Sequence, residues 1–265
     1  MKTVPVSVVI PTYKRPYLTF RTVRSIFENQ DILPEEVIVI EDDSKPISYP
    51  ALRSFIDKKL IKYLVNERNR GVSYSRNRGV KESRCDFICF LDSDDFFLKD
   101  KIKIHYEFMK RNPRIMGSLS NGIILNNYKR KLPRYITYLK EVKRDYFVLS
   151  DIDGSYLIFP SGAMFRKEVF NVIKWDERLK ASEEIKFFLD FLFKFRELHL
   201  IDNSRELIVF DRRFLNKDNL TIRYKMDFWK LKAFELFILE NRLYAKSLMD
   251  RYIELRQKLI KIFKD

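Results

Sequence analysis

Short apolar runs recur along the first part of the chain and are separated by longer, mixed segments. The runs have the length and character of strands buried on both faces, as in a parallel sheet that helices cover on each side. They occupy residues 4–10, 36–40, 60–64 and 87–91. The segments between them are predicted to be helices, over residues 18–29, 49–59 and 73–83. This alternation predicts strand–helix–strand units with right-handed crossovers, and therefore an α/β fold with a mostly parallel sheet flanked by helices.

The ends of two predicted helices carry residues that favour turns and caps. Gly71 is expected to take a positive φ in the turn before the helix over 73–83, and Ser73 is expected to cap that helix. Ser182 is expected to cap the helix predicted over 185–195 in the same way. These positions predict where the chain changes direction at the edge of the sheet.

The middle of the chain predicts further strands and helices around one basic stretch. Helices are predicted over residues 99–111 and 167–172, and strands over 115–125, 151–165 and 207–210. Residues 128–144 are rich in Lys and Arg and show no clean period, which indicates a loop with helical portions. The loop is either an ordinary solvated surface or a flap that faces an anion.

A long basic helical tail is predicted over residues 227–264. We therefore divide the chain into a domain over 1–215 and a helical C-terminal extension over 216–265. An amphipathic basic helix can lie on an anionic membrane surface, and it can equally pack on its own domain with its charges in water. Packing is favoured for the first half of the tail, and both alternatives stay open for its last turns.

Composition and charge narrow the partners and the compartment. The chain has 265 residues, and 52 Lys and Arg against 37 Asp and Glu give a net charge of +15. That balance favours anionic partners, namely phosphorylated small molecules, acidic lipid headgroups or nucleic acid. Cys85 and Cys89 are spaced for neither a disulfide framework nor a zinc site and are interpreted as core residues in a reducing compartment. No apolar run approaches the ~20 residues that span a bilayer. A cytoplasmic protein is therefore expected, with the inner face of the membrane as the place of any peripheral contact.

Acidic residues follow two of the predicted buried strands. Asp92, Asp94 and Asp95 come directly after the run over 87–91, and Glu41 to Asp43 follow the run over 36–40. The run over 4–10 likewise ends in a polar cluster, Pro11 to Tyr13. Parallel strands place their carboxyl ends at one edge of a sheet, where ligands of α/β proteins bind. Crowded carboxylates repel unless a positive charge lies between them, and a divalent cation shared with a substrate phosphate would supply that charge. The alternative is a solvated turn, since Asp and Ser are ordinary turn residues.

Two common nucleotide-binding motifs are missing from the sequence. No G-x-G-x-x-G follows the first predicted strand, and no G-x-x-x-x-G-K-[ST] occurs in the chain. A dinucleotide-dependent dehydrogenase or a P-loop enzyme is therefore not expected.

Taken together, six segments resemble the family-two glycosyltransferases, which are inverting enzymes with the GT-A fold. The segments are 7–15 (SVVIPTYKR), 37–44 (VIVIEDDS), 69–79 (NRGVSYSRNRG), 87–95 (FICFLDSDD), 161–170 (SGAMFRKEVF) and 182–191 (SEEIKFFLDF). The resemblance covers about residues 4–213 and does not extend into the tail. It implies a GT-A, Rossmann-like, mostly parallel mixed sheet.

The resemblance also implies which residues bind the donor. Pro11, Thr12 and Tyr13 would line the nucleotide pocket. Asp43 would accept a hydrogen bond from the base, a uracil imide, and Arg76 would lie near the base and the ribose.

The remaining roles fall on two acidic motifs. Asp92, Ser93 and Asp94 match the D-x-D motif of the family, which implies that Asp94 binds Mn²⁺ or Mg²⁺ and that Asp92 reaches the ribose or the metal. Glu184 matches the catalytic base within what is commonly Glu-Asp. Here the pair is Glu183-Glu184, so either carboxylate remains a candidate for the base.

The implied reaction is a single displacement that moves a sugar from a nucleoside-diphosphate sugar, UDP-linked, to an acceptor hydroxyl with inversion. The metal would stabilise the charge that develops on the departing diphosphate, while a carboxylate removes the acceptor's proton. The acceptor is a glycan, a lipid-linked molecule or a protein.

Three alternatives remain at this point. One is a protein of the same fold that binds a nucleotide sugar without turning it over. Another is a basic nucleic-acid-binding protein, although no helix-turn-helix, zinc-finger or RNA-binding signature is present, so nucleic acid is not the expected partner. A third is a nucleotidyltransferase, which normally opens with a glycine-rich basic loop that is absent here.

Overall fold

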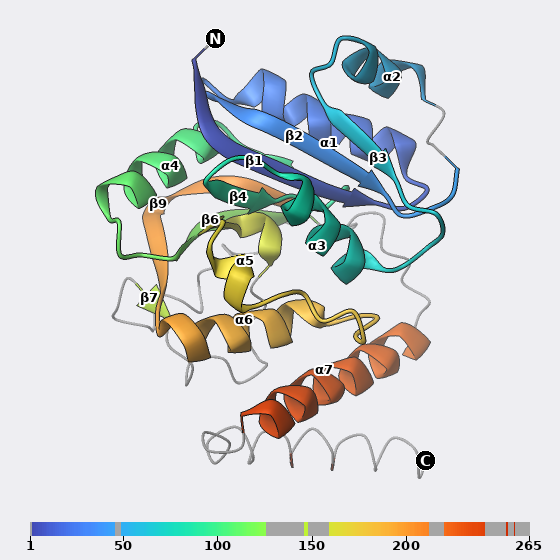
Figure 1. Cartoon of the computed structure of the whole chain (residues 1–265), viewed down its shortest axis with the longest axis vertical. Helices are drawn as coiled ribbons and strands as arrows, with labels where there is room; N and C mark the ends of the chain where they lie inside the picture. Colours follow the sequence, from blue (N-terminus) through green and yellow to red (C-terminus); the bar gives the residue numbers. More distant parts are fainter. Residues whose placement is uncertain are drawn as a thin grey trace.

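The protein folds around one large mixed β-sheet (Figure 1). The structure, a computed structural model, describes residues 2–45, 49–125, 146–147, 159–211 and 220–241, with residues 253 and 257 besides. Within these residues the sheet has nine strands in the order β3-β2-β1-β4-β8-β6-β9-β5, and β7 pairs with β9. The basic stretch over 128–144 lies outside the described residues.

The first half of the chain forms the predicted parallel units. Its elements are β1 (Thr3–Thr12), α1 (Pro16–Asn29), β2 (Leu33–Glu41), α2 (Pro50–Asp57), β3 (Lys62–Val65), α3 (Val72–Glu82) and β4 (Phe87–Phe90). β1 pairs in parallel with both β2 and β4, and β2 pairs in parallel with β3. The carboxyl ends of β1, β2 and β4 therefore meet at one edge of the sheet, as the apolar runs predicted.

The second half makes the sheet mixed. Its elements are β5 (Phe96–Phe97), α4 (Lys101–Arg111), β6 (Gly117–Leu125), β7 (Tyr146–Phe147), the short 3₁₀ helix η3 (Pro160–Gly162), β8 (Ala163–Arg166), α5 (Val169–Val172), α6 (Glu183–Phe195), β9 (Leu198–Asp211) and α7 (Leu220–Glu240). β8 is antiparallel to both β4 and β6. β9 begins earlier than the predicted strand over 207–210; its first residues include the buried Leu198, Leu200 and Ile201, and the polar residues 202–206 separate them from the predicted run.

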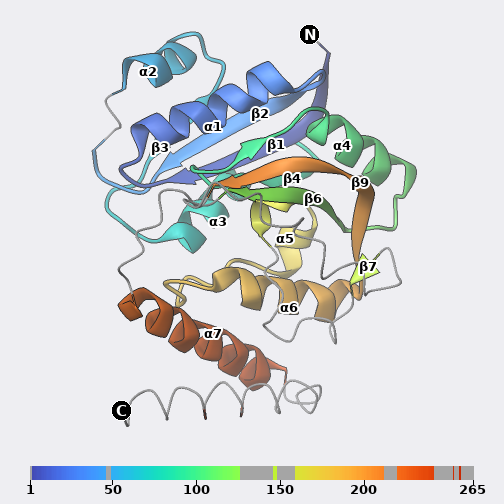
Figure 2. The same ribbon diagram turned by 180° about the vertical axis from the view of Figure 1, so that it is seen from behind.

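Two hydrophobic cores lie on opposite faces of the sheet. One joins the sheet to α1, α2 and α4, through residues such as Ile26, Leu52 and Ile102. The other joins it to α3, α5, α6 and α7, and Figures 1 and 2 show these helices on the other side of the strands. This sandwich explains the continuous apolar runs, because β1 and β4 are covered on both faces.

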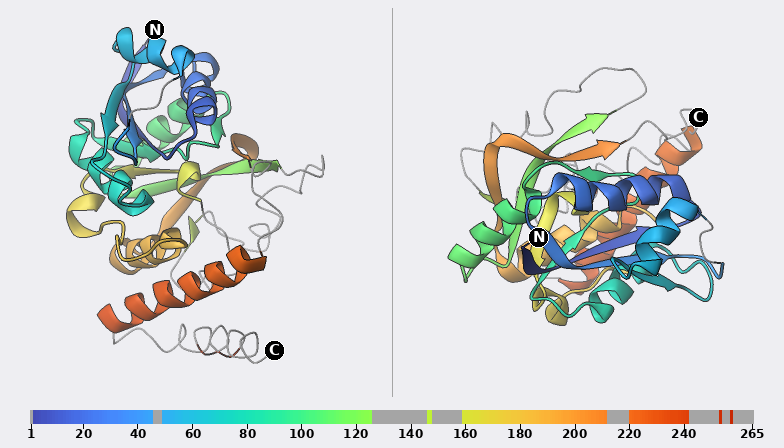
Figure 3. Two further views of the ribbon diagram at one scale, coloured as in Figure 1. Left: turned by 90° about the vertical axis from the view of Figure 1, so that its right-hand side faces the viewer. Right: turned by 90° about the horizontal axis from the view of Figure 1, so that it is seen from above.

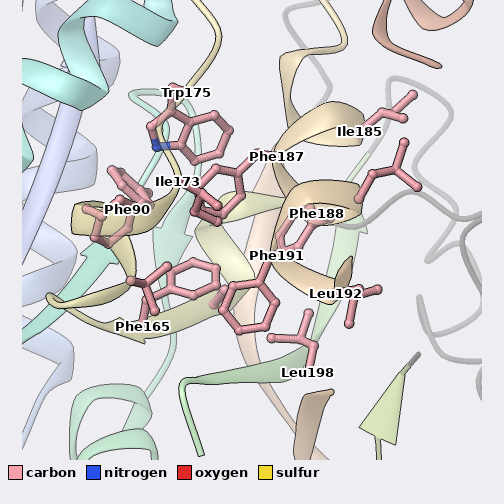
Figure 4. Packing of buried hydrophobic residues seen from close by; sticks show 14 of the residues in the cluster. Phe90, Phe165, Ile173, Trp175, Ile185, Phe187, Phe188, Phe191, Leu192 and Leu198 are labelled. Carbon is pink, nitrogen blue, oxygen red and sulfur yellow. The ribbon is translucent and has the colours of Figure 1, made fainter. Parts of the chain in front are cut away.

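Aromatic side chains fill the second core (Figure 4). Trp175 stacks on Phe187 with ring centroids 4.1 Å apart, and Phe90 meets Trp175 edge to face. Phe165 packs against Phe187 and Phe191 from the side of the sheet. This packing fixes the loop before α6 against the end of β4, and so it positions two parts of the site described below.

The described part of the tail packs on the domain. α6 lies between the sheet and α7 (Figure 3), and Ala233, Phe234, Leu236 and Phe237 of α7 are buried in the second core. The first half of the tail therefore packs as expected, whereas the last turns lie outside the described residues except for two positions. Within the described chain, no helix combines the length and apolar character needed to cross a membrane.

The predicted cap at Ser73 is wrong, the predicted cap at Ser182 has the N-cap position without the hydrogen bond, and one predicted turn is confirmed. α3 begins at Val72 after Gly71, whose φ is 92°, so Ser73 lies inside the helix and its hydroxyl has no hydrogen-bond partner among the described residues. Ser182 precedes α6 with a φ of 57° and makes no capping hydrogen bond. The turn before α3 is held instead by Asp42, which accepts hydrogen bonds from the backbone N–H groups of Arg70 and Gly71, both at 2.8 Å.

Candidate active site

A cleft of about 510 Å³ opens at the carboxyl ends of β1, β2 and β4. Its walls come from the β1–α1 turn, the end of β2, the start of α3, the loop after β4 and the loop before α6. The lining residues are Pro11, Thr12, Tyr13, Arg15, Asp42, Asn69, Gly71, Val72, Ser75, Arg76, Asp92, Ser93, Asp94, Lys180 and Glu183. Most of the residues that the sequence singled out therefore meet in one place, with Asp43 and Glu184 as the exceptions.

The acidic loop after β4 is fixed through its backbone on two sides. The N–H of Asp92 donates to Ser161 Oγ of η3 at 3.0 Å. On the other side, Arg21 Nη2 donates to the carbonyl of Asp94 at 2.7 Å, and Thr22 Oγ1 donates to the carbonyl of Asp95 at 2.7 Å. Because the backbone is held in this way, the carboxylates of Asp92 and Asp94 are presented to the cleft in a defined position.

Arg76 connects this loop to the start of α6. Its Nη2 lies 2.7 Å from Asp92 Oδ1, and its Nη1 lies 2.7 Å from Glu183 Oε1. The guanidinium also lies over the ring of Trp175, 4.4 Å from the centroid. Burial opposes the charge of Arg76, but the two carboxylates outweigh it and raise the pKa of the guanidinium. A permanent buried cation thus stands between the D-x-D motif and the Glu183-Glu184 pair.

The two acidic residues at the end of β2 have different surroundings. Asp42 is buried and lines the cleft, and besides the turn before α3 it accepts a hydrogen bond from Asn66 Nδ2 at 2.7 Å. Asp43 does not line the cleft; its carboxylate pairs with Lys14 at 3.3 Å. The backbone N–H of Ser44 and the Lys14 ammonium lower the pKa of Asp43. Sequence reasoning chose Asp43 between two adjacent acids, and a shift of one residue at a strand end turns a side chain to the other face.

Glu184 differs from Glu183 in its electrostatic surroundings. Glu183 is buried and held by Arg76, whereas no Lys or Arg of the described chain pairs with Glu184. Burial, and next the neighbouring charge of Glu183, raise the pKa of Glu184 to about 8. Glu184 does not line the cleft itself, but it adjoins Glu183, which does. A carboxyl whose pKa is near neutral is suited to taking up a proton.

The sequence analysis gave no role in the site to several residues of the cleft, namely Asp42, Arg15, Asn69, Gly71, Val72, Ser75 and Lys180. Arg15 Nη1 pairs with Asp94 Oδ2 at 2.9 Å and is half exposed. The available signal was that Arg15 follows the first predicted strand within the SVVIPTYKR segment, although its pairing with Asp94 needs the folded chain.

The cleft suits a cation that shares its ligands with a substrate. The described residues contain no group of three or more His, Cys, Asp and Glu side chains that could hold a metal ion by themselves. Two carboxylates, of Asp92 and Asp94, do face the cleft. Mg²⁺ and similar ions are commonly bound by one or two carboxylates together with substrate phosphates, and this donor set fits that arrangement.

Comparison with known proteins gives the family. The model of the family described as Glycosyl transferase family 2 matches residues 7–173, more than half of the chain. The chain belongs to this family and is an enzyme of the glycosyltransferase class. It is 26% identical over 246 residues to the uncharacterized glycosyltransferase MJ1057 of Methanocaldococcus jannaschii. The alignment covers 89% of this chain and 78% of that protein.

The name of a second relative states its activity. The chain is 32% identical over 142 residues to the Escherichia coli UDP-Glc:alpha-D-GlcNAc-diphosphoundecaprenol beta-1,3-glucosyltransferase WfgD. That alignment covers 52% of this chain and 55% of WfgD, so the chain matches about half the length of that relative.

Solved structures show the same fold. S. aureus TarS 1-349 in complex with UDP-GlcNAc superimposes with a TM-score of 0.66 at 21% identity, covering 95% of this chain and 69% of that one. The Pyrobaculum calidifontis mannosyltransferase PcManGT, in complex with GDP-Man and Mn²⁺, gives a TM-score of 0.65 at 13% identity with the same coverage. The expected GT-A fold is therefore confirmed.

Proposed function

We propose that the protein is a metal-dependent, inverting glycosyltransferase that moves a sugar from a UDP-sugar to an acceptor hydroxyl. The observation that carries this proposal is the convergence of Asp92, Asp94 and Arg76 on one cleft at the carboxyl edge of the sheet. The UDP-GlcNAc complex of TarS and the UDP-Glc substrate in the name of WfgD support the choice of UDP.

Donor binding falls to the wall formed by β1, β2 and α3. Pro11, Thr12 and Tyr13 would contact the nucleotide, together with Ser93 from the acidic loop. Of the two aspartates at the end of β2, Asp42 lines the cleft and Asp43 does not. Asp42 is therefore better placed to accept a hydrogen bond from the base. Arg76 would act mainly by holding Asp92 in position, because its own charge is already paired.

Asp94 and Asp92 would hold Mn²⁺ or Mg²⁺ at the cleft. A bound divalent cation would neutralise negative charge that develops on the leaving diphosphate. Arg15, which pairs with Asp94 and is half exposed, could be drawn towards the diphosphate when the donor binds. The Mn²⁺ in the PcManGT complex supports a cation in this fold.

Glu184 would remove the proton of the acceptor hydroxyl as its oxygen attacks the anomeric carbon. Its raised pKa of about 8 suits a proton acceptor, whereas Glu183 is occupied by a fully charged guanidinium. Attack from the side opposite the diphosphate inverts the anomeric centre in one step, so the reaction needs no covalent enzyme intermediate. We therefore assign no nucleophile to the protein.

The acceptor we propose is a lipid-linked diphosphate sugar. The name of WfgD specifies an acceptor of this class. Such an acceptor resides in a membrane, and the net charge of +15 would favour work at an anionic membrane surface, on its cytoplasmic side.

Calorimetric titration of UDP, with and without Mn²⁺, tests the donor and metal together. The wild-type protein should bind UDP in Mn²⁺ and much more weakly in chelator, and Asp94→Ala should remove the difference. Equal binding of UDP by the wild-type protein in Mn²⁺ and in chelator would overturn the metal dependence. Incubation with UDP-glucose and a polyprenyl-diphosphate-linked GlcNAc should then give a β-linked product, and an α-linked product would overturn inversion.

A further inference from the structure

One lysine is fully buried without lining the cleft, and it has no part in the proposed reaction. Lys101 begins α4, which packs against β6 and β9 (Figure 2), and its side chain is 0% exposed. No carboxylate among the described residues pairs with it. A buried ammonium without a counter-ion costs several kcal/mol unless its hydrogen bonds are satisfied.

Three acceptors surround the ammonium of Lys101. Nζ lies 2.9 Å from Ser120 Oγ, 3.0 Å from the carbonyl of Gly162 and 3.0 Å from His105 Nε2. His105 Nδ1 lies 2.8 Å from Ser118 Oγ. Burial lowers the pKa of His105 well below its usual range, so the ring is neutral and Nε2 can accept while Nδ1–H donates to Ser118. Burial lowers the pKa of Lys101 to about 7, and in the ammonium form each of its three N–H groups has a partner.

The carbonyl that Lys101 holds belongs to η3, the short helix that fixes the acidic loop. Gly162 follows Ser161, and Ser161 is itself fully buried. The hydroxyl of Ser161 accepts the N–H of Asp92 at 3.0 Å, one residue after the backbone of Leu91 has made its bond to Val9 of β1. Ser161 thus supplies the hydrogen-bond acceptor for the first backbone N–H beyond the pairing with β1.

We propose that Lys101 and Ser161 are positioning residues. They hold the backbone of the acidic loop so that the carboxylates of Asp92 and Asp94 are placed to bind the metal–diphosphate. Lys101 holds η3 from beneath through Gly162, and Ser161 transmits that position to the backbone of Asp92. This inference rests on the proposed function of Asp92 and Asp94.

The structure offers a matched control next to the acidic loop. Ser25 of α1 is buried, and its Oγ accepts the N–H of Phe97 at 3.1 Å, so it makes the same kind of bond beyond the acidic residues. Ser25→Ala and Ser161→Ala remove one buried hydroxyl acceptor each. Only Ser161→Ala frees the N–H of Asp92.

Calorimetric titration with UDP in Mn²⁺, with thermal melting of each protein, tests the proposal. Ser161→Ala should weaken Mn²⁺-dependent UDP binding by about 10-fold, the lower end of the usual effect of residues that support metal ligands. Ser161→Thr keeps the hydroxyl and should restore binding. Ser25→Ala should melt at a temperature similar to Ser161→Ala but bind as the wild type does. Lys101→Met should weaken binding in the same direction as Ser161→Ala.

Two results separate the failure of this inference from the failure of the proposed function. If Ser161→Ala and Ser25→Ala bind UDP–Mn²⁺ equally well while Asp94→Ala does not bind, the positioning role is wrong and the donor site stands. If the wild-type protein itself shows no Mn²⁺-dependent binding of UDP, the proposed function is wrong. If Lys101→Met does not fold, the comparison of Ser161→Ala, Ser161→Thr and Ser25→Ala still decides the question.

Discussion

Arg76 and Glu183, which are 107 residues apart in the sequence, form a buried ion pair with Nη1 and Oε1 2.7 Å apart. The same guanidinium binds Asp92, so one side chain joins the donor side of the cleft to the start of α6. Removal of one partner from such a pair leaves an uncompensated buried charge. The pair therefore occupies Glu183, and under the proposed function it leaves Glu184 as the base.

Exchange of either glutamate for glutamine separates these roles. Glu184→Gln should leave UDP–Mn²⁺ binding almost unchanged and lower transfer by ~10²- to 10⁴-fold, the usual contribution of a general base. Glu183→Gln should instead lower the melting temperature and weaken UDP binding, because Arg76 loses a charged partner. Calorimetry and single-turnover transfer measure both effects. Loss of transfer with intact binding in Glu183→Gln would show that Glu183 is the base.

The raised pKa of Glu184 predicts two opposite dependences on pH. The carboxylate must be ionised to accept a proton, so kcat/KM should rise with pH and level off above about 8. The folded state holds the proton of Glu184 up to about pH 8, whereas the unfolded state releases it near 4.5. The free energy of unfolding should therefore fall as pH rises between these values. Subtraction of the Glu184→Gln stability curve isolates this contribution, and identical slopes would contradict the pKa.

Asp42 and Asp43 should differ sharply when each is replaced by alanine. Asp42→Ala removes three hydrogen bonds that hold Asn66 and the turn before α3. We therefore expect the free energy of unfolding to fall by about 1–3 kcal/mol and UDP binding to weaken. Asp43→Ala breaks only its hydrogen bonds to Ser44 and its pair with Lys14, and should bind UDP nearly as the wild type does. Denaturant titration and calorimetry measure the two quantities. If only Asp43→Ala lost UDP binding strongly, Asp43 rather than Asp42 would be the residue that contacts the nucleobase.

Gly79 should not tolerate a side chain, although alanine favours helices. A Cβ on Gly79 of α3 would overlap the Val9 side chain of β1. Gly79→Ala should therefore destabilise the protein by about 1–3 kcal/mol, the usual cost of overpacking. Because Arg76 lies on the same helix, UDP binding should weaken as well. In the Gly79→Ala/Val9→Ala double variant the overlap disappears, so its loss of stability should be smaller than the sum of the two single losses. Simple additivity would contradict the contact.

The sequence was sufficient for the parallel half of the fold and for the general position of the site. Continuous apolar runs predicted strands covered on both faces, and the pairing of β1 with β2 and β4 confirms them. Because carboxyl ends of parallel strands share an edge, Thr12, Asp92 and Asp94 could be placed together before any coordinates. The first part of β9 was not predicted, because the polar residues 202–206 interrupt the apolar pattern between Ile201 and Leu207.

What the sequence by itself determined is the strands of the parallel half and the edge at which the acidic motifs meet, because strands buried on both faces form continuous apolar runs. Only the tertiary structure decided between neighbours, placing Asp42 rather than Asp43 in the cleft and pairing Glu183 rather than Glu184 with Arg76. It alone also joined Lys101 to η3 and η3 to Asp92. Such choices depend on the direction of single side chains and on partners far away in the chain, which no local pattern specifies.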